Sequence, residues 1–167
     1  PYYAMKLIRG NTLKDVIEEF HQLPLDRPEA RNLAFTRLLH NFIDVCNAVG
    51  FAHERGVLHR DLKPANIMVG ADGRFTVMDL GIVKAVTEDA EGVMSASAGT
   101  PRYMPPEMFS NMDVDARADL YSLGIVAFYA LTGNTPFDGP TPMSILYQQA
   151  HVDAPSMGHV APGVSRS

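Results

Sequence analysis

The sequence predicts a mainly α-helical chain with one short β-hairpin. Residues 29–54 carry apolar side chains at intervals of three and four, which is typical of an amphipathic helix. Residues 114–131 become apolar almost all round after Asp119, which is typical of a buried helix. Two β-like runs flank the Gly-Ala-Asp-Gly turn at residues 70–73. These observations indicate an α+β fold in which helices dominate.

Composition bounds the class of protein. The 167 residues suffice for one domain with a core, and 46% hydrophobic with 20% charged residues is ordinary for a globular protein. The net charge of −5 argues against a nucleic-acid partner held by general basicity. Cys46 is the only cysteine, so the chain has no internal disulfide and suits a reducing compartment as a buried structural thiol. No segment of membrane-spanning length and composition is expected.

The N-terminal half should contain a strand and two helices. Residues 2–8 favour a strand that ends in Arg-Gly-Asn at residues 9–11. Residues 12–20 favour a short helix with Thr12 as its N-cap. The helix over residues 29–54 should end before Gly56, and its histidines, His40 and His53, are expected to be solvated or capping. Its predicted buried stripe is Leu38, Leu39, Phe42, Val45, Cys46 and Val49.

The C-terminal half should contain the hairpin and two more helices. Strands are predicted over residues 67–69 and 74–78, followed by a loop over residues 82–98 that is rich in small and acidic residues. The buried helix over residues 114–131 is stopped by Gly133, and a last helix is expected over residues 143–150. The tail is expected to be loosely held.

The hairpin also brings together side chains of one chemical kind. Asp61 and Asn66 precede the first strand, and Asp79 follows the second. The hairpin geometry predicts that the three side chains lie close together. Two carboxylates and an amide oxygen are hard ligands that suit Mg²⁺ and can orient a hydroxyl group.

Four motifs in order resemble those of protein kinases. The run His-Arg-Asp-Leu-Lys-Pro-Ala-Asn at residues 59–66 resembles the catalytic loop, and Asp-Leu-Gly at 79–81 resembles the metal-binding tripeptide with Leu for Phe. Residues 99–107 resemble the segment that closes the activation loop, with Pro for Ala in its final tripeptide. Residues 119–124 resemble the start of the central buried helix. The chain is therefore similar to eukaryotic-like (Hanks-type) Ser/Thr kinases, and Tyr121 in place of the usual Trp favours the bacterial branch.

This resemblance implies the C-terminal (large) lobe of the kinase fold. Residues 1–11 would be the last strand of the small lobe and the hinge, residues 12–150 the large lobe, and residues 151–167 a loosely ordered tail. The rest of the small lobe, with its glycine-rich loop and strand lysine, is absent from the 167 residues. The sequence is thus expected to be a partial kinase domain that has negligible activity by itself.

The resemblance also implies roles at the reaction centre. Asp61 would accept or orient the substrate hydroxyl proton, and Lys63 would neutralise charge on the transferring phosphate. Asn66 and Asp79 would bind Mg²⁺ (or Mn²⁺), with Gly81 allowing the backbone to turn beside the metal. ATP would also meet the hinge and the hairpin through Met5, Lys6, Ile8 and Met68.

Three further residues receive structural roles from the resemblance. His59 would be packed rather than catalytic, and the Asp119 carboxylate would hold backbone N–H groups of the catalytic loop. Glu107 would enter a buried ion pair with an arginine later in the large lobe.

Substrate class and control are also implied. Lys63 and Thr100 mark kinases that act on Ser or Thr. Arg60 would receive an activation-loop phosphate, for which Ser95 and Ser97 are the candidate acceptors.

The expected function is transfer of the ATP γ-phosphate to Ser/Thr hydroxyls of protein substrates by the complete protein. That protein would be cytoplasmic, or this chain the cytoplasmic part of a membrane protein. One alternative is an incompetent, pseudokinase-like binding module, which the intact Asp61, Asn66 and Asp79 disfavour. A second is a small-molecule phosphotransferase, which Lys63 and residues 99–107 disfavour.

Overall fold

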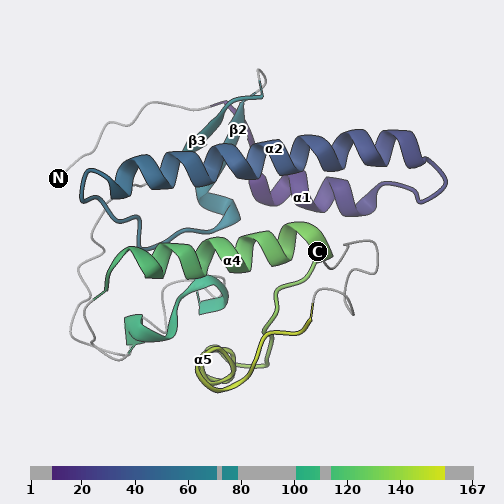
Figure 1. The fold of residues 1–167 in the computed structure, drawn as a ribbon. Helices are drawn as coiled ribbons and strands as arrows, with labels where there is room; N and C mark the ends of the chain where they lie inside the picture. The colour runs from purple at the N-terminus through teal and green to yellow at the C-terminus, as the bar shows by residue number, and fades with distance from the viewer. Residues whose placement is uncertain (1–8, 71–72, 79–100, 110–113, 157–167) are drawn as a thin grey trace.

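The computed structural model describes residues 9–70, 73–78, 101–109 and 114–156 (Figure 1). Two long helices, α2 (Pro28–His53) and α4 (Ala116–Thr132), run side by side in opposite directions. Helix α1 (Leu13–Gln22) lies against α2, and α5 (Pro142–His151) lies on the far side of α4. The remaining elements are the strands β1 (Gly10–Thr12), β2 (Ile67–Gly70) and β3 (Phe75–Val77) and the 3-10 helices η1 (Pro64–Asn66), η2 (Pro101–Tyr103) and η3 (Pro106–Phe109).

Helix α1 begins where the sequence predicts. The Thr12 hydroxyl accepts a hydrogen bond from the Asp15 amide at 3.2 Å, and the Asp15 carboxylate accepts one from the Thr12 amide at 2.8 Å. This reciprocal capping box satisfies two N–H groups that the first turn leaves without helical partners. The short helix is confirmed, and it ends two residues later than predicted, at Gln22.

Helix α2 confirms the predicted long helix but corrects its buried face. Leu38, Val45 and Val49 are at most 2% exposed, and Phe42 and Cys46 pack partly buried against them. Leu39 is 40% exposed, so its assignment to the buried stripe was wrong. Adjacent residues of a helix are about 100° apart, which places Leu39 beyond the edge of the face centred on its neighbour.

The small sheet has the order β1-β2-β3 with antiparallel neighbours. The β2–β3 hairpin is confirmed, but residues 10 and 11, expected to end a strand, instead form β1 with Thr12. Gly10 pairs with Gly70, and a Cβ atom on Gly10 would collide with the Val69 carbonyl. Glycine at this position therefore permits a close approach of two strands, which the sequence pattern alone does not distinguish from a turn.

Helices α4 and α5 follow the prediction within two residues. Asp115 caps α4 by accepting from the Arg117 amide at 2.8 Å, and Gly133 ends it with φ of +75°. Eight of the 17 residues of α4 are buried, but Leu120 is 56% exposed, so the helix is not buried on every side as its composition predicted. The strand over residues 2–8 and the loop over residues 82–98 fall outside the described residues, as does the tail beyond residue 156.

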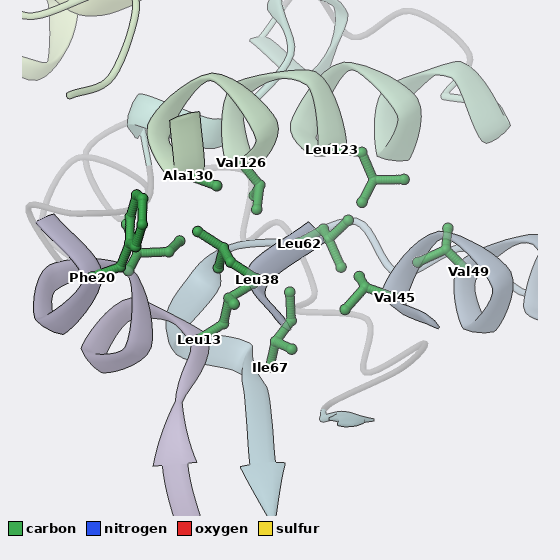
Figure 2. Packing of buried hydrophobic residues seen from close by; sticks show 11 residues of the cluster. Leu13, Phe20, Leu38, Val45, Val49, Leu62, Ile67, Leu123, Val126 and Ala130 are labelled. Atoms are coloured by element: carbon green, nitrogen blue, oxygen red, sulfur yellow. The ribbon is translucent and has the colours of Figure 1, made fainter. Parts of the chain in front are cut away.

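A hydrophobic core joins α1, α2, α4 and the start of β2 (Figure 2), and a second, smaller cluster of Ile125, Phe137 and Ile145 joins α5 to α4. Figure 2 shows side chains of α1, α2 and α4 pointing toward one another from different sides, with Leu62 and Ile67 between them. Leu62 comes from the loop after α2, and Ile67 begins β2. The segment with the predicted catalytic residues is therefore anchored in the core at two points.

None of the helices in the described ranges combines the length and apolar composition needed to cross a membrane.

The corrected face of α2 yields a prediction about stability. Leu38→Ala should lower the free energy of unfolding by about 2–5 kcal/mol, because it leaves a cavity in the packed core. Leu39→Ala removes the same atoms from a partly exposed position and should cost less than about 1 kcal/mol. Urea unfolding of both variants tests this, and equal losses would contradict the assigned face.

Candidate active site

The loop that follows α2 passes between α2 and α4 (Figure 1) and is held by a buried carboxylate. Asp119 lies in the first turn of α4 and is 1% exposed. Its Oδ2 accepts from the His59 amide at 2.8 Å, and its Oδ1 accepts from the Arg60 amide at 2.9 Å. The N-terminal turn of a helix favours a negative charge, which offsets part of the cost of burying it. These are the contacts that the resemblance implies for Asp119.

The backbone at Arg60 is in an unusual conformation. Arg60 has φ of +65°, and it is the one non-glycine residue with positive φ among the described residues. A long side chain in this region costs about 1–3 kcal/mol and persists only where its surroundings fix it. The bonds from Asp119 to two consecutive amides supply that constraint. In this conformation the Arg60 side chain is exposed.

His59 connects the loop to the end of the hairpin. Its ring is 1% exposed, with Nε2 2.9 Å from the Met78 carbonyl oxygen and Nδ1 3.2 Å from the Asp61 amide nitrogen. A ring with its proton on Nε2 satisfies both contacts, because it donates to the carbonyl and accepts from the amide. His59 is therefore packed, and it fixes the backbone of Asp61 relative to the residue that precedes Asp79.

Asp61, Lys63 and Asn66 meet at one carboxylate. The Lys63 ammonium lies 2.9 and 3.2 Å from the two Asp61 oxygens, and the side chains are 16% and 24% exposed respectively. The Asn66 amide nitrogen donates to the Asp61 carbonyl at 2.8 Å and to its Oδ2 at 3.1 Å. The Asp61 carboxylate is thus held in place while part of it reaches the surface.

The orientation of the Asn66 amide follows from its partners. Both Asp61 atoms that it meets are acceptors, so the amide NH₂ faces Asp61 and the amide oxygen is directed away from it. An oxygen in this position fits a hard cation such as Mg²⁺. Asp79, the expected second ligand, lies outside the described residues. Within the described ranges no group of three or more His, Cys, Asp or Glu side chains could hold a metal ion.

A groove of about 570 Å³ opens beside Lys63. It lies between the loop, α1, η2 and the end of α4, and is lined by Lys14, Lys63, Pro64, Ala65, Arg102, Tyr103, Tyr129, Gly133, Asn134, Thr135 and Asp138. Arg102 forms a 2.6 Å ion pair with Asp138 on its wall and donates to the Thr135 hydroxyl at 3.1 Å. The hydrogen bond from Arg102 lowers the pKa of the Asp138 carboxyl. Burial raises the pKa of Tyr103 to about 12, so its phenol is neutral.

Two helices fix η2, which forms one side of this groove. The Ser122 hydroxyl of α4 donates to the Tyr103 carbonyl at 2.8 Å. The Gln149 amide of α5 donates to the carbonyls of Pro101 and Arg102 at 2.9 and 3.0 Å. Sequence reasoning missed Gln149 and the groove residues Lys14, Arg102 and Asp138, because no local motif marks contacts between such distant segments.

The other residues selected from the sequence divide into two groups. Met68 lies half-buried in β2, opposite Thr12 and Thr76, and Glu107 lies half-buried in η3. Eight lie outside the described residues: Met5, Lys6, Ile8, Asp79, Gly81, Ser95, Ser97 and Thr100.

The histidines and the cysteine of α2 lie in different environments. His40 is exposed as expected, but His53 is neither solvated nor capping, because its Nε2 lies 2.7 Å from the Asp119 Oδ2. No pattern in the sequence indicates this partner, which is 66 residues away. Cys46 packs half-buried against the core, and burial raises the pKa of its thiol.

Comparisons with known proteins agree with the motifs. The model of the protein kinase domain matches residues 2–159. The chain is 39% identical over 163 residues to serine/threonine-protein kinase PknB of Mycobacterium tuberculosis, covering 95% of this chain and 24% of the relative. It is 37% identical over 150 residues to a probable serine/threonine-protein kinase of Corynebacterium efficiens, covering 89% and 21%. The chain therefore belongs to the protein kinase family, and it spans about a quarter of the length of these relatives.

The loop geometry predicts a large effect of a small change at Asp119. In Asp119→Asn the amide oxygen can accept from one backbone N–H, while the amide NH₂ faces the other donors. The free energy of unfolding should fall by about 2–4 kcal/mol, because buried hydrogen bonds to a charged group are lost.

The matched control is Asp115→Asn on the same helix. Asparagine caps helices as well as aspartate does, so this variant should stay within about 0.5 kcal/mol of the wild type. Chemical denaturation of both variants tests the prediction, which fails if the two changes cost the same.

Proposed function

We propose that this chain is part of a protein kinase domain that transfers the γ-phosphate of ATP to serine or threonine hydroxyls of protein substrates. The observation that carries the proposal is the Asp61 carboxylate, fixed by Lys63 and Asn66 at distances of 2.9 and 3.1 Å and partly exposed beside a groove. The names of its relatives specify Ser/Thr kinases and support the same substrate class.

The residues of the loop divide the chemistry between them. Asp61 orients the substrate hydroxyl and accepts its proton, and Lys63 offsets negative charge on the transferring phosphate. Phosphoryl transfer needs little covalent help, so positioning and charge supply most of the rate enhancement. The groove is the place for the substrate polypeptide, since it is lined by Lys63, whose ammonium contacts the Asp61 carboxylate.

ATP and Mg²⁺ fit the donor set of the hairpin. Asn66 would hold the metal through its amide oxygen, together with Asp79, and Met68 would lie under the adenine with Met5, Lys6 and Ile8. When bound, the metal supplies charge neutralisation along the phosphates. Gly81 would allow the turn beside it.

We assign the domain parts by the same reasoning. Residues 1–11 are the last strand of the small lobe and the hinge, residues 12–150 belong to the large lobe, and residues 151–167 form a tail. Among the described residues, the dominance of helices and the small three-stranded sheet support this assignment. Thr100 and Glu107 would belong to the segment that closes the activation loop, and the domain would act in the cytoplasm.

The decisive substitution is at Asp61. In the full-length protein, Asp61→Asn should lower kcat for peptide phosphorylation about 10²–10⁴-fold, the usual effect of removing a positioned base. Asp79→Ala should abolish Mg²⁺-dependent ATP turnover. Radiolabelled phosphate transfer to a Ser/Thr peptide measures both variants.

Asp44→Asn is the matched control, because Asp44 is exposed on α2 and touches none of these groups. It should leave kcat unchanged. Full kcat in Asp61→Asn would remove the assigned role, and phosphate on an aminoglycoside or choline instead of the peptide would overturn the substrate class.

A second part of the proposal concerns control. The exposed Arg60 side chain would bind a phosphate on Ser95 or Ser97, because a phosphate carries about −1.5 to −2 charges and pairs bidentately with a guanidinium. Mass spectrometry of the full-length protein should find phosphate on one of these serines. The double variant Ser95→Ala/Ser97→Ala and the variant Arg60→Ala should lose similar activity. An unmodified segment together with full activity would contradict this control.

A further inference from the structure

We infer that His53, the last residue of α2, is a positioning residue for phosphoryl transfer. It acts through Asp119, which holds the backbone that carries Asp61. The inference rests on the proposed function, and it adds a residue outside the four kinase-like motifs. The observation that carries it is the 2.7 Å contact between His53 Nε2 and Asp119 Oδ2.

The contact joins three separate parts of the fold. His53 ends α2, Asp119 lies in the first turn of α4, and the two amides that Asp119 binds belong to the loop between these helices. One carboxylate therefore fixes the distance between the ends of two helices and the path of the loop. The His53 side chain is 16% exposed and that of Asp119 is 1% exposed, so water competes little for the bond.

The geometry shows why the carboxylate needs this third donor. Oδ1 of Asp119 accepts from the Arg60 amide alone, while Oδ2 accepts from both the His59 amide and His53. Without His53, the carboxylate would be held only by the segment that it must itself hold. A donor on α2, which is packed into the core, supplies an independent anchor for its rotamer. The Nε2 proton is present both in the neutral tautomer that this contact selects and in the imidazolium, so the anchor requires no particular charge on the ring.

The anchor has a consequence at the catalytic carboxylate. Arg60, with φ of +65°, stands between the amide of His59 and Asp61. A loosened Asp119 would allow this turn to relax toward a more populated backbone region, and Asp61 would shift with it. Displacements of about 1 Å in a reacting group can cost about a hundredfold in rate, so even partial loosening lowers kcat. The groove proposed for the substrate and the residues proposed for ATP do not include residues 59–61, which predicts an effect on kcat with little effect on KM.

Two amide substitutions test this without removing polarity. In His53→Gln the side-chain amide Nε2 can replace the ring Nε2 as donor. In His53→Asn the side chain is shorter, and its amide cannot reach Asp119. In the full-length protein, His53→Asn should lower kcat about tenfold with KM for ATP and peptide within about twofold of wild type, and His53→Gln should recover most of the loss. His40→Asn, the same change at an exposed position of α2, should behave as wild type.

A second measurement reports the loop directly. Hydrogen exchange of the His59 and Arg60 amides, followed by NMR or fragment mass spectrometry, should be faster in His53→Asn than in His53→Gln. The inference requires faster exchange and lower kcat together in the Asn variant. Unchanged exchange, or unchanged kcat with faster exchange, would overturn it. If the wild type itself transfers no phosphate, the proposed function fails, and the exchange comparison still decides whether His53 holds the loop.

Discussion

The Asp119 carboxylate is the interaction on which the rest of the site depends. It lies in the core of the molecule, where an unpaired charge would cost several kcal/mol, about as much as the whole stability of a small domain. Two backbone amides and a histidine nitrogen satisfy it. The fold can keep this charge only while the loop is in place, so loop conformation and domain stability are coupled.

Along the loop, buried residues alternate with partly exposed residues that carry the proposed functional side chains. His59, Leu62, Pro64 and Ile67 are buried, while the residues between them are at least partly exposed. Each functional side chain therefore stands next to a residue that is fixed in the core, and its backbone has little freedom to move. The density of charged side chains among apolar ones, conspicuous in the sequence, has this physical meaning.

The sequence was a good guide wherever the controlling interactions are local. The Thr12 capping box, the hairpin turn and the helix that is apolar on all sides depend on near neighbours or on composition, and each was predicted within two residues. Leu39 shows the limit of periodicity, because a helical face has an edge that spacing does not define. His53 and Gln149 show a second limit, because their partners are distant in sequence and no motif connects them. The kinase-like motifs identified Asp61, Lys63 and Asn66, but their mutual orientation depends on the folded loop and is not encoded in the motif.

At the wall of the groove, the buried Gln149 side chain holds η2 in place as Asp119 holds the loop. Gln149 is 7% exposed, and its Oε1 is one of two buried side-chain atoms in the described residues that lack a hydrogen-bond partner. Leaving such an atom unpaired costs about 1–3 kcal/mol. The two bonds from its amide nitrogen to η2 offset that cost and hold Pro101 and Arg102 at the groove. A leucine of similar size would remove the cost but would also release η2. The residue at this position is therefore explained by what it positions, as is Asp119 at the other side of the site.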